Sequence, residues 1–123
     1  MTSDRKLADF QQWTLTVLGL LSATSDRQVA YLQESGVGTD ELLLQFDDVL
    51  HVARARLADS SLEQKDFFLL SKVGARVESV NARPDPIWDE VALKEAAEWR
   101  DLRIEARVAK EILERSWNSD SGS

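Results

Sequence analysis

Residues 43–57 read LLQFDDVLHVARARL, and this stretch decides the fold. Its main apolar residues recur at spacings of three and four, at Leu43, Phe46, Leu50, Ala53 and Leu57. Two acidic and two basic residues lie between them, Asp47, Asp48, Arg54 and Arg56. Because such a spacing places side chains on one face of an α-helix, the stretch predicts an amphipathic helix whose apolar face packs into a core.

The same spacing recurs on both sides of this stretch and predicts further helices. We expect helices over residues of about 3–22, 24–34, 39–59, 60–80 and 86–117. Ser60 and Ser61 each precede a Glu or Gln by three residues, at Glu63 and Gln64. This is the capping-box pattern, so we expect the fourth helix to begin at these two serines.

The last of these segments is too long to be one helix. From Pro86, which Asp85 would cap, to Trp117, a continuous helix would be roughly 48 Å long at 1.5 Å per residue. A domain of this size is only about 30–35 Å across. We therefore expect a break near residues 94–97, where Glu95 interrupts the apolar stripe.

The predicted fold class follows from this succession of helices. We expect an all-α protein, folded as a single compact bundle of five to six helices, in which a short helix precedes the long C-terminal one. The length of 123 residues fits one domain. Residues 1–117 are expected to form the helical domain, and residues 118–123 a polar C-terminal tail.

The composition narrows the classes of partner. The chain has 22 acidic and 15 basic residues, a net charge of −7, which disfavours nucleic-acid binding. No apolar run approaches the ~20 residues that a membrane span requires. There is no cysteine, so disulfides and thiolate metal sites are excluded. We expect a soluble, cytoplasmic protein that binds neither nucleic acid nor membranes.

One helical face is locally basic. Four residues spaced three and four apart form this strip: Arg100, Arg103, Arg107 and Lys110. Acidic residues accompany them along the same segment: Asp101, Glu105, Glu111 and Glu114. Because the two signs are interleaved, we expect a mixed, solvated face.

The sequence lacks the common catalytic patterns. It has no GxGxxG or GxxxxGK[ST] phosphate loop, no GxSxG nucleophile elbow and a single histidine. We therefore expect a protein that is not an enzyme and has no cofactor.

Two patterns leave a metal site open as an alternative. His51 follows Asp48 by three residues, an arrangement found in di-metal bundles, although its simplest partner is Asp47. The pairs Glu95 with Glu98 and Glu111 with Glu114 have the spacing of helical magnesium-dependent hydrolases. That chemistry needs the two pairs on facing helices, whereas here they fall on one helix or on two collinear ones.

The four tryptophans are candidate core or contact residues. Trp13, Trp88 and Trp99 follow the apolar spacing and are expected in the core. Trp117 lies near the predicted end of the last helix, where a core position and an exposed anchor for a partner are both open.

The candidate binding residues are acidic. Asp40, Glu41, Asp47 and Asp48 have no base among residues 40–48 and would form a face that attracts a basic protein partner. A solvated face with helix-favouring N-terminal acids is the alternative.

In size, acidity and helical character the chain resembles the small acidic helical immunity proteins that block basic nuclease toxins. It is also similar to small bacterial helical proteins of unassigned function. No motif carries this likeness, so no residue roles follow from it. The expected function is a protein-binding module, in the form of an immunity-type inhibitor if this resemblance holds. The alternatives are a homodimer joined through the apolar runs 42–44 and 67–70, and a magnesium-dependent helical hydrolase.

Overall fold

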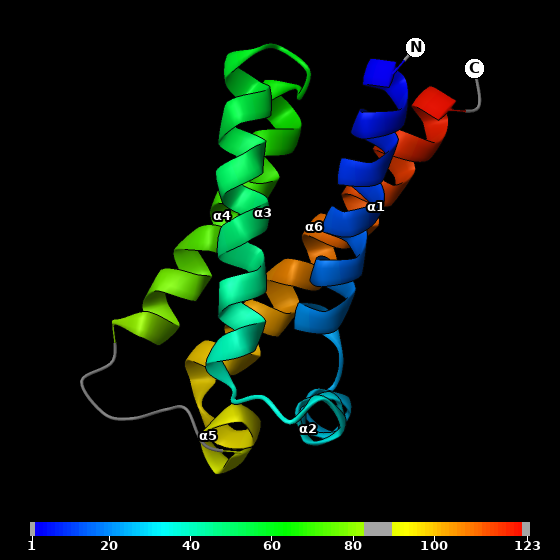
Figure 1. The fold of residues 1–123 in the computed structure, drawn as a ribbon. Coiled ribbons are helices and arrows are strands. Elements are labelled where there is room, and N and C mark those ends of the chain that lie inside the picture. The colour runs from blue at the N-terminus through cyan, green and yellow to red at the C-terminus, as the bar shows by residue number, and fades with distance from the viewer. Residues whose placement is uncertain (1, 83–89, 122–123) are drawn as a thin grey trace.

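The structure, a computed structural model, describes the backbone of residues 2–82 and 90–121 and the side chains of residues 6–82 and 91–118. Within these residues the chain forms six α-helices and no strand (Figure 1). The helices are α1 (Thr2–Ser22), α2 (Ser25–Ser35), α3 (Asp40–Ala58), α4 (Gln64–Asn81), α5 (Glu90–Glu95) and α6 (Ala97–Ser121). The predicted all-α bundle is confirmed.

The four long helices pack around one core, and the two short ones lie at one end of it. Figure 1 shows α1 beside α6 and α3 beside α4, with α6 also packed against α4 and α1 against α3. Each of these neighbours runs antiparallel to its partner. Near the start of α6, α2 and α5 contact each other and close this end of the bundle. None of the helices in the described ranges combines the length and apolar composition that a bilayer span requires.

The predicted break in the last segment is confirmed. Helix α5 ends at Glu95, α6 begins at Ala97, and Ala96 lies between them. The Ala96 amide still donates to the Ala92 carbonyl at 2.8 Å, so the backbone stays hydrogen-bonded up to the break. Helix α6 continues to Ser121, four residues beyond the expected end at Trp117. The predicted cap of Asp85 and Pro86 lies outside the described residues.

The predicted start of the fourth helix at Ser60 and Ser61 is wrong, because α4 begins at Gln64. Ser60 adopts a left-handed conformation with φ of 66°, which ends the preceding turn instead of beginning a helix. The Ser61 amide donates to the Asp59 carboxylate at 2.9 Å. Leu62 then inserts into the core with 4% of its surface exposed. Burial of Leu62 therefore overrides the local capping pattern.

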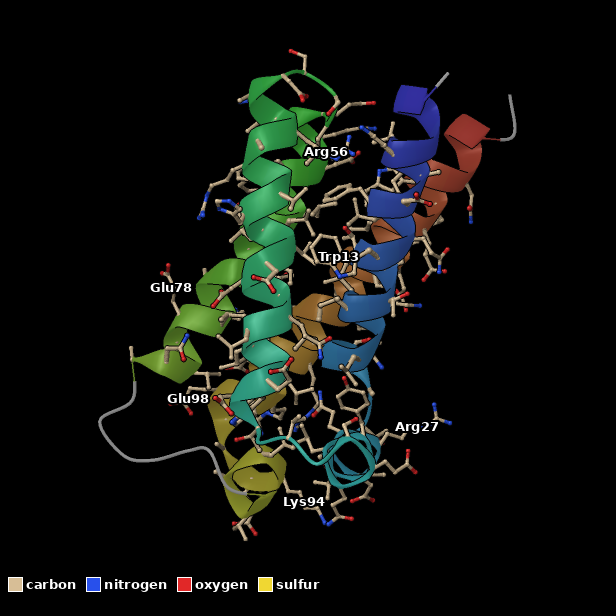
Figure 2. The ribbon with its side chains drawn as sticks, in the orientation of Figure 1. Trp13, Arg27, Arg56, Glu78, Lys94 and Glu98 are labelled. Carbon is tan, nitrogen blue, oxygen red and sulfur yellow. The ribbon has the colours of Figure 1, made fainter. Side chains whose placement is uncertain are left out.

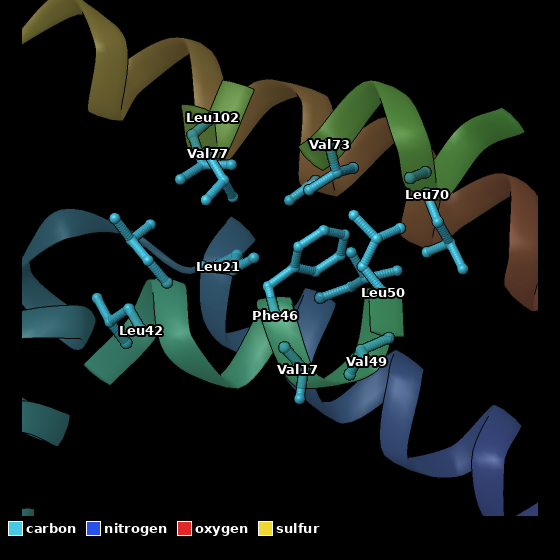
Figure 3. Packing of buried hydrophobic residues seen from close by; sticks show 14 of the residues in the cluster. Val17, Leu21, Leu42, Phe46, Val49, Leu50, Leu70, Val73, Val77 and Leu102 are labelled. Atoms are coloured by element: carbon cyan, nitrogen blue, oxygen red, sulfur yellow. The ribbon is translucent and has the colours of Figure 1, made fainter. Parts of the chain in front are cut away.

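Phe46 lies at the centre of the core with none of its surface exposed. Figure 3 shows it among apolar side chains from α1, α4 and α6, including Val17, Val73 and Leu102. Helices α3 and α4 approach closely at Gly74, where a Cβ would lie 2.9 Å from a Leu50 methyl carbon. A larger residue at this position would require the Leu50 side chain to shift.

Candidate functional site

The four acids singled out from the sequence lie along the outer side of α3. Asp40, Asp47 and Asp48 are exposed, and Glu41 is half-buried. Leu44, which lies between them in the sequence, is 50% exposed. The N-terminal position of Asp40 and Glu41 is stabilising because the start of a helix carries partial positive charge. The face thus combines carboxylates with one exposed apolar side chain.

Helix α4 adds a fifth acid, Glu78, to this face. Partial burial raises the pKa of Asp47, and the negative charges of Asp48 and Glu78 raise it further, while Arg54 acts in the opposite direction. Figure 2 shows Glu78 on the outer side of α4. Sequence reasoning missed Glu78, because only the antiparallel pairing of α3 with α4 brings it near Asp47. We call these five residues the acidic face: Asp40, Glu41, Asp47, Asp48 and Glu78.

The predicted metal patterns do not converge. In the described part of the chain, no group of three or more His, Asp or Glu side chains is placed to hold a metal ion. His51 is exposed, and no ion pair between it and Asp47 is found. The two glutamate pairs lie far apart, because Glu98 and Glu111 are separated by roughly 20 Å along α6 at 1.5 Å per residue. Glu114 instead accepts a hydrogen bond from Lys110 at 2.6 Å.

Trp117 is not an exposed anchor, and that alternative is wrong. Only 5% of its surface is exposed, and its indole N–H donates to the Asp66 carboxylate at 3.0 Å. Its ring also lies 6.5 Å from that of Phe10 on α1. Because α6 continues past residue 117 between α1 and α4, the indole is enclosed by both helices. No sequence pattern pointed to Asp66, because its partner Trp117 lies 51 residues away.

The other tryptophans divide between core and surface. Trp99 is fully buried, as predicted. Trp13 is 37% exposed, so its predicted core position is wrong. Figure 2 shows Trp13 on the side of α1 that faces α3, where its ring meets that of Phe10 edge-on at 6.4 Å. Trp88 lies outside the described residues.

A groove of about 510 Å³ opens between α1 and α3, with Leu7, Val52 and Ala55 among its lining residues. Arg56 crosses it, donating to the Lys6 carbonyl at 3.1 Å and to the Ser61 hydroxyl at 3.3 Å. The guanidinium also lies over the Phe10 ring, 5.1 Å from its centre. These contacts hold the ends of the two helices together and give Arg56 a structural role.

Compared with known protein families, with curated proteins and with solved structures, the chain matches none of them. The function is therefore inferred from the residues of this chain alone. Of the candidate binding residues selected from the sequence, the acids of α3 lie together on one accessible face, whereas Trp117 is buried.

Proposed function

We propose that the protein is a cytoplasmic, non-enzymatic binding module that engages a basic protein partner through the acidic face. The observation that carries this proposal is the gathering of four acids of α3 and Glu78 of α4 on one accessible face, and the environment of Asp47 supports it. Its pKa is raised by partial burial and by two neighbouring carboxylates, Asp48 and Glu78. Repulsion between these acids is only partly offset by Arg54, so a basic partner would relieve it.

The chemistry of the acidic face suits recognition of a protein. A cluster of like charge steers an oppositely charged partner and raises its association rate, an effect that salt weakens. Leu44, half-exposed on the same helix, supplies an apolar contact of the kind found at the centre of interfaces. An immunity-type inhibitor of a basic toxin is the form of this function that the size and acidity of the chain favour.

Affinity capture from the native host tests the proposal. We expect the wild-type protein to retain a basic protein at low salt and to release much of it at high salt. The double variant Asp47→Asn with Asp48→Asn should lose this partner. A matched control, Asp9→Asn with Glu34→Gln, removes the same charge from exposed positions on α1 and α2 and should retain it. Recovery of no basic partner, or equal recovery by both double variants, would contradict the proposal.

A homodimer is the second candidate, and an apolar strip on α6 favours it. Ile104, Val108 and Ile112 recur every four residues and are 49%, 41% and 37% exposed. The apolar runs that first suggested a dimer leave only Leu44 and Phe68 exposed, since Leu42, Leu43 and Leu70 are buried and Phe67 and Leu69 are half-buried.

Sedimentation equilibrium distinguishes this candidate from a monomer. The wild-type protein should be a dimer at micromolar concentration, and Val108→Glu should make it monomeric, since a buried unpaired charge opposes association. A wild-type monomer would exclude the dimer and leave the acidic face unaffected.

A further inference from the structure

The basic strip predicted along the last helix does not remain one strip in the structure. Lys110 bonds to Glu114, and the end of its aliphatic chain lies against Gly19 of α1. The other three, Arg100, Arg103 and Arg107, gather around a pocket of about 210 Å³. Ile104 and residues 22–24, where α1 turns into α2, complete its described lining.

The described acidic side chains near these arginines do not line the pocket. Glu105 forms an ion pair with Arg76 of α4 at 3.5 Å, on a different side of α6. Asp101 approaches the Arg100 Nε only at 4.0 Å and does not line the pocket. Asp26, in the first turn of α2, pairs with Lys94 at 3.4 Å. Among the described side chains, three guanidinium groups and no carboxylate line this pocket.

Arg103 is held in place at the pocket wall. Its Nη1 donates to the Leu93 carbonyl at 2.8 Å and to the Gln28 side-chain oxygen at 3.4 Å. Gln28 is itself fully buried, and its amide nitrogen donates to two carbonyls at the end of α1, those of Leu20 and Leu21, at 3.0 and 2.9 Å. One buried glutamine therefore ties Arg103 to the turn between α1 and α2, so this side of the pocket is formed before any ligand arrives.

The positive charge of the pocket is only partly balanced, by Asp101 beside Arg100. Partial burial lowers the pKa of Arg103, and the nearby charge of Arg100 lowers it further. Such repulsion between guanidinium groups is relieved when an anion lies between them. The net charge of the protein is −7, so the positive charge of these arginines is a local exception to its overall negative field.

The start of α2 lies next to the pocket, because Thr24, the N-cap of this helix, is one of the lining residues. The Thr24 hydroxyl accepts from the Arg27 amide at 3.2 Å. The amides of Ser25 and Asp26 belong to the first turn and have no acceptor within the helix. A helix start carries partial positive charge, which reinforces that of the arginines.

We propose that this pocket binds the tetrahedral oxyanion group, phosphoryl or sulfuryl, of a small metabolite. Guanidinium groups match such oxyanions through paired, charge-assisted hydrogen bonds. A pocket of this volume lies below the roughly 300–1,000 Å³ of sites for drug-sized ligands, so it suits one oxyanion with a short appendage. Ile104, 49% exposed at the rim, provides an apolar contact for that appendage.

Titration with inorganic phosphate and, separately, with inorganic sulfate tests the proposal, with ionic strength held constant by sodium chloride. Backbone-amide NMR should show saturable shifts confined to residues 22–27 and 100–107 in at least one titration. The anion that saturates at lower concentration identifies the preferred group. Arg107→Gln should weaken this binding by about tenfold or more, because charge-assisted hydrogen bonds are lost.

Arg115→Gln is the matched control. It removes the same charge from an exposed position two turns further along α6 and should leave binding unchanged. Thermal unfolding of both variants without anion should match the wild type, since both arginines are exposed. Shifts that fail to saturate with either anion, or equal weakening by Arg107→Gln and Arg115→Gln, would overturn the proposal.

Discussion

The acidic face on α3 and the arginine pocket on α6 lie on helices that both carry acidic and basic residues, yet the two surfaces have opposite charge. On α3, the neighbouring helix α4 brings Glu78 toward Asp47, so like charge accumulates. On α6, Arg76 of α4 pairs with Glu105, and of the nearby acids only Asp101 stays beside one of the arginines, Arg100. Most of the acidic face is exposed, with Glu41 half-buried, whereas the arginines of α6 surround a hollow.

The charge of a helical surface therefore depends on the helix that packs beside it. One helix contributes charges of both signs, and its neighbours determine which of them are neutralised. The outer face of α3 is suited to a macromolecular partner, because its acids are spread along more than two turns of accessible surface. The pocket on α6 is suited to a small anion, because its charges converge on a limited volume.

The substitution with the largest predicted effect on stability is at Phe46, in the core that supports both surfaces. Phe46→Ala removes a fully buried ring one residue from Asp47 and should cost about 3–5 kcal/mol of unfolding free energy, measured by urea denaturation. Leu44→Ala, at a position 50% exposed on the same helix, should cost less than about 1 kcal/mol. Similar losses for the two variants would contradict the described packing.

A smaller effect is expected at two tryptophans that differ in burial, Trp117 on α6 and Trp13 on α1. Trp117→Phe removes the indole donor from the buried carboxylate of Asp66 and should cost about 1–3 kcal/mol, because a buried charged acceptor loses a hydrogen bond. Trp13→Phe is the control, since its ring is 37% exposed, and it should cost less than about 1 kcal/mol. Chemical denaturation of both variants measures the difference, and equal costs would argue against the contact between Trp117 and Asp66.

The smallest expected effect is on the pH dependence of stability, which should differ in sign between Asp47 on the acidic face and Asp59, which is hydrogen-bonded by Ser61. The pKa of Asp47 is raised above its ordinary 3.8, so the folded protein binds more protons than the unfolded chain just above that pH. Stability contributed by Asp47 therefore falls as pH rises through this range. Asp47→Asn should stabilise the fold slightly at neutral pH, by less than about 0.5 kcal/mol, with no gain at pH below both pKa values.

Asp59 has the opposite sign and serves as the comparison. Hydrogen bonds from Ser61 lower its pKa below 3.8, so its contribution is present above that value and is lost as pH falls. Asp59→Asn should destabilise the fold at neutral pH. Thermal unfolding of both variants at neutral and acidic pH checks these signs, and a shift in the same direction at neutral pH would contradict the difference between the two sites.

Much of the fold could be predicted from the sequence, because helical spacing and length are local properties. The comparison of helix length with domain size called for a break, the interruption of the apolar stripe at Glu95 placed it near residues 94–97, and the structure has it at Ala96. The start of α4 could not be predicted, because the capping pattern at Ser60 and Ser61 competes with burial of Leu62. Trp13 is exposed where a core position was expected, and of the two positions left open for Trp117 the structure has the buried one, since exposure depends on which neighbouring helix covers each ring.

The candidate sites were predictable only in part. The acids of α3 lie close together in the sequence and could be found by counting charges. Glu78 and the contacts of Arg103 could not, because they depend on pairings between distant segments, such as Arg103 with Gln28 at a separation of 75 residues. The same limit explains why the basic strip was expected to be a mixed face. Its charges are redistributed by pairing, of Glu105 with Arg76 on α4 and of Glu114 with Lys110.

Backbone-amide NMR of the wild-type protein, titrated in parallel with inorganic phosphate and with a lysine-rich peptide, tests the central claim most directly. The claim is that two separate surfaces of opposite charge serve different ligands. Phosphate should shift residues 22–27 and 100–107, and the peptide should shift residues 40–48 and Glu78, each leaving the other set unchanged. Overlapping shifts, or shifts spread evenly over all helices by both ligands, would contradict it.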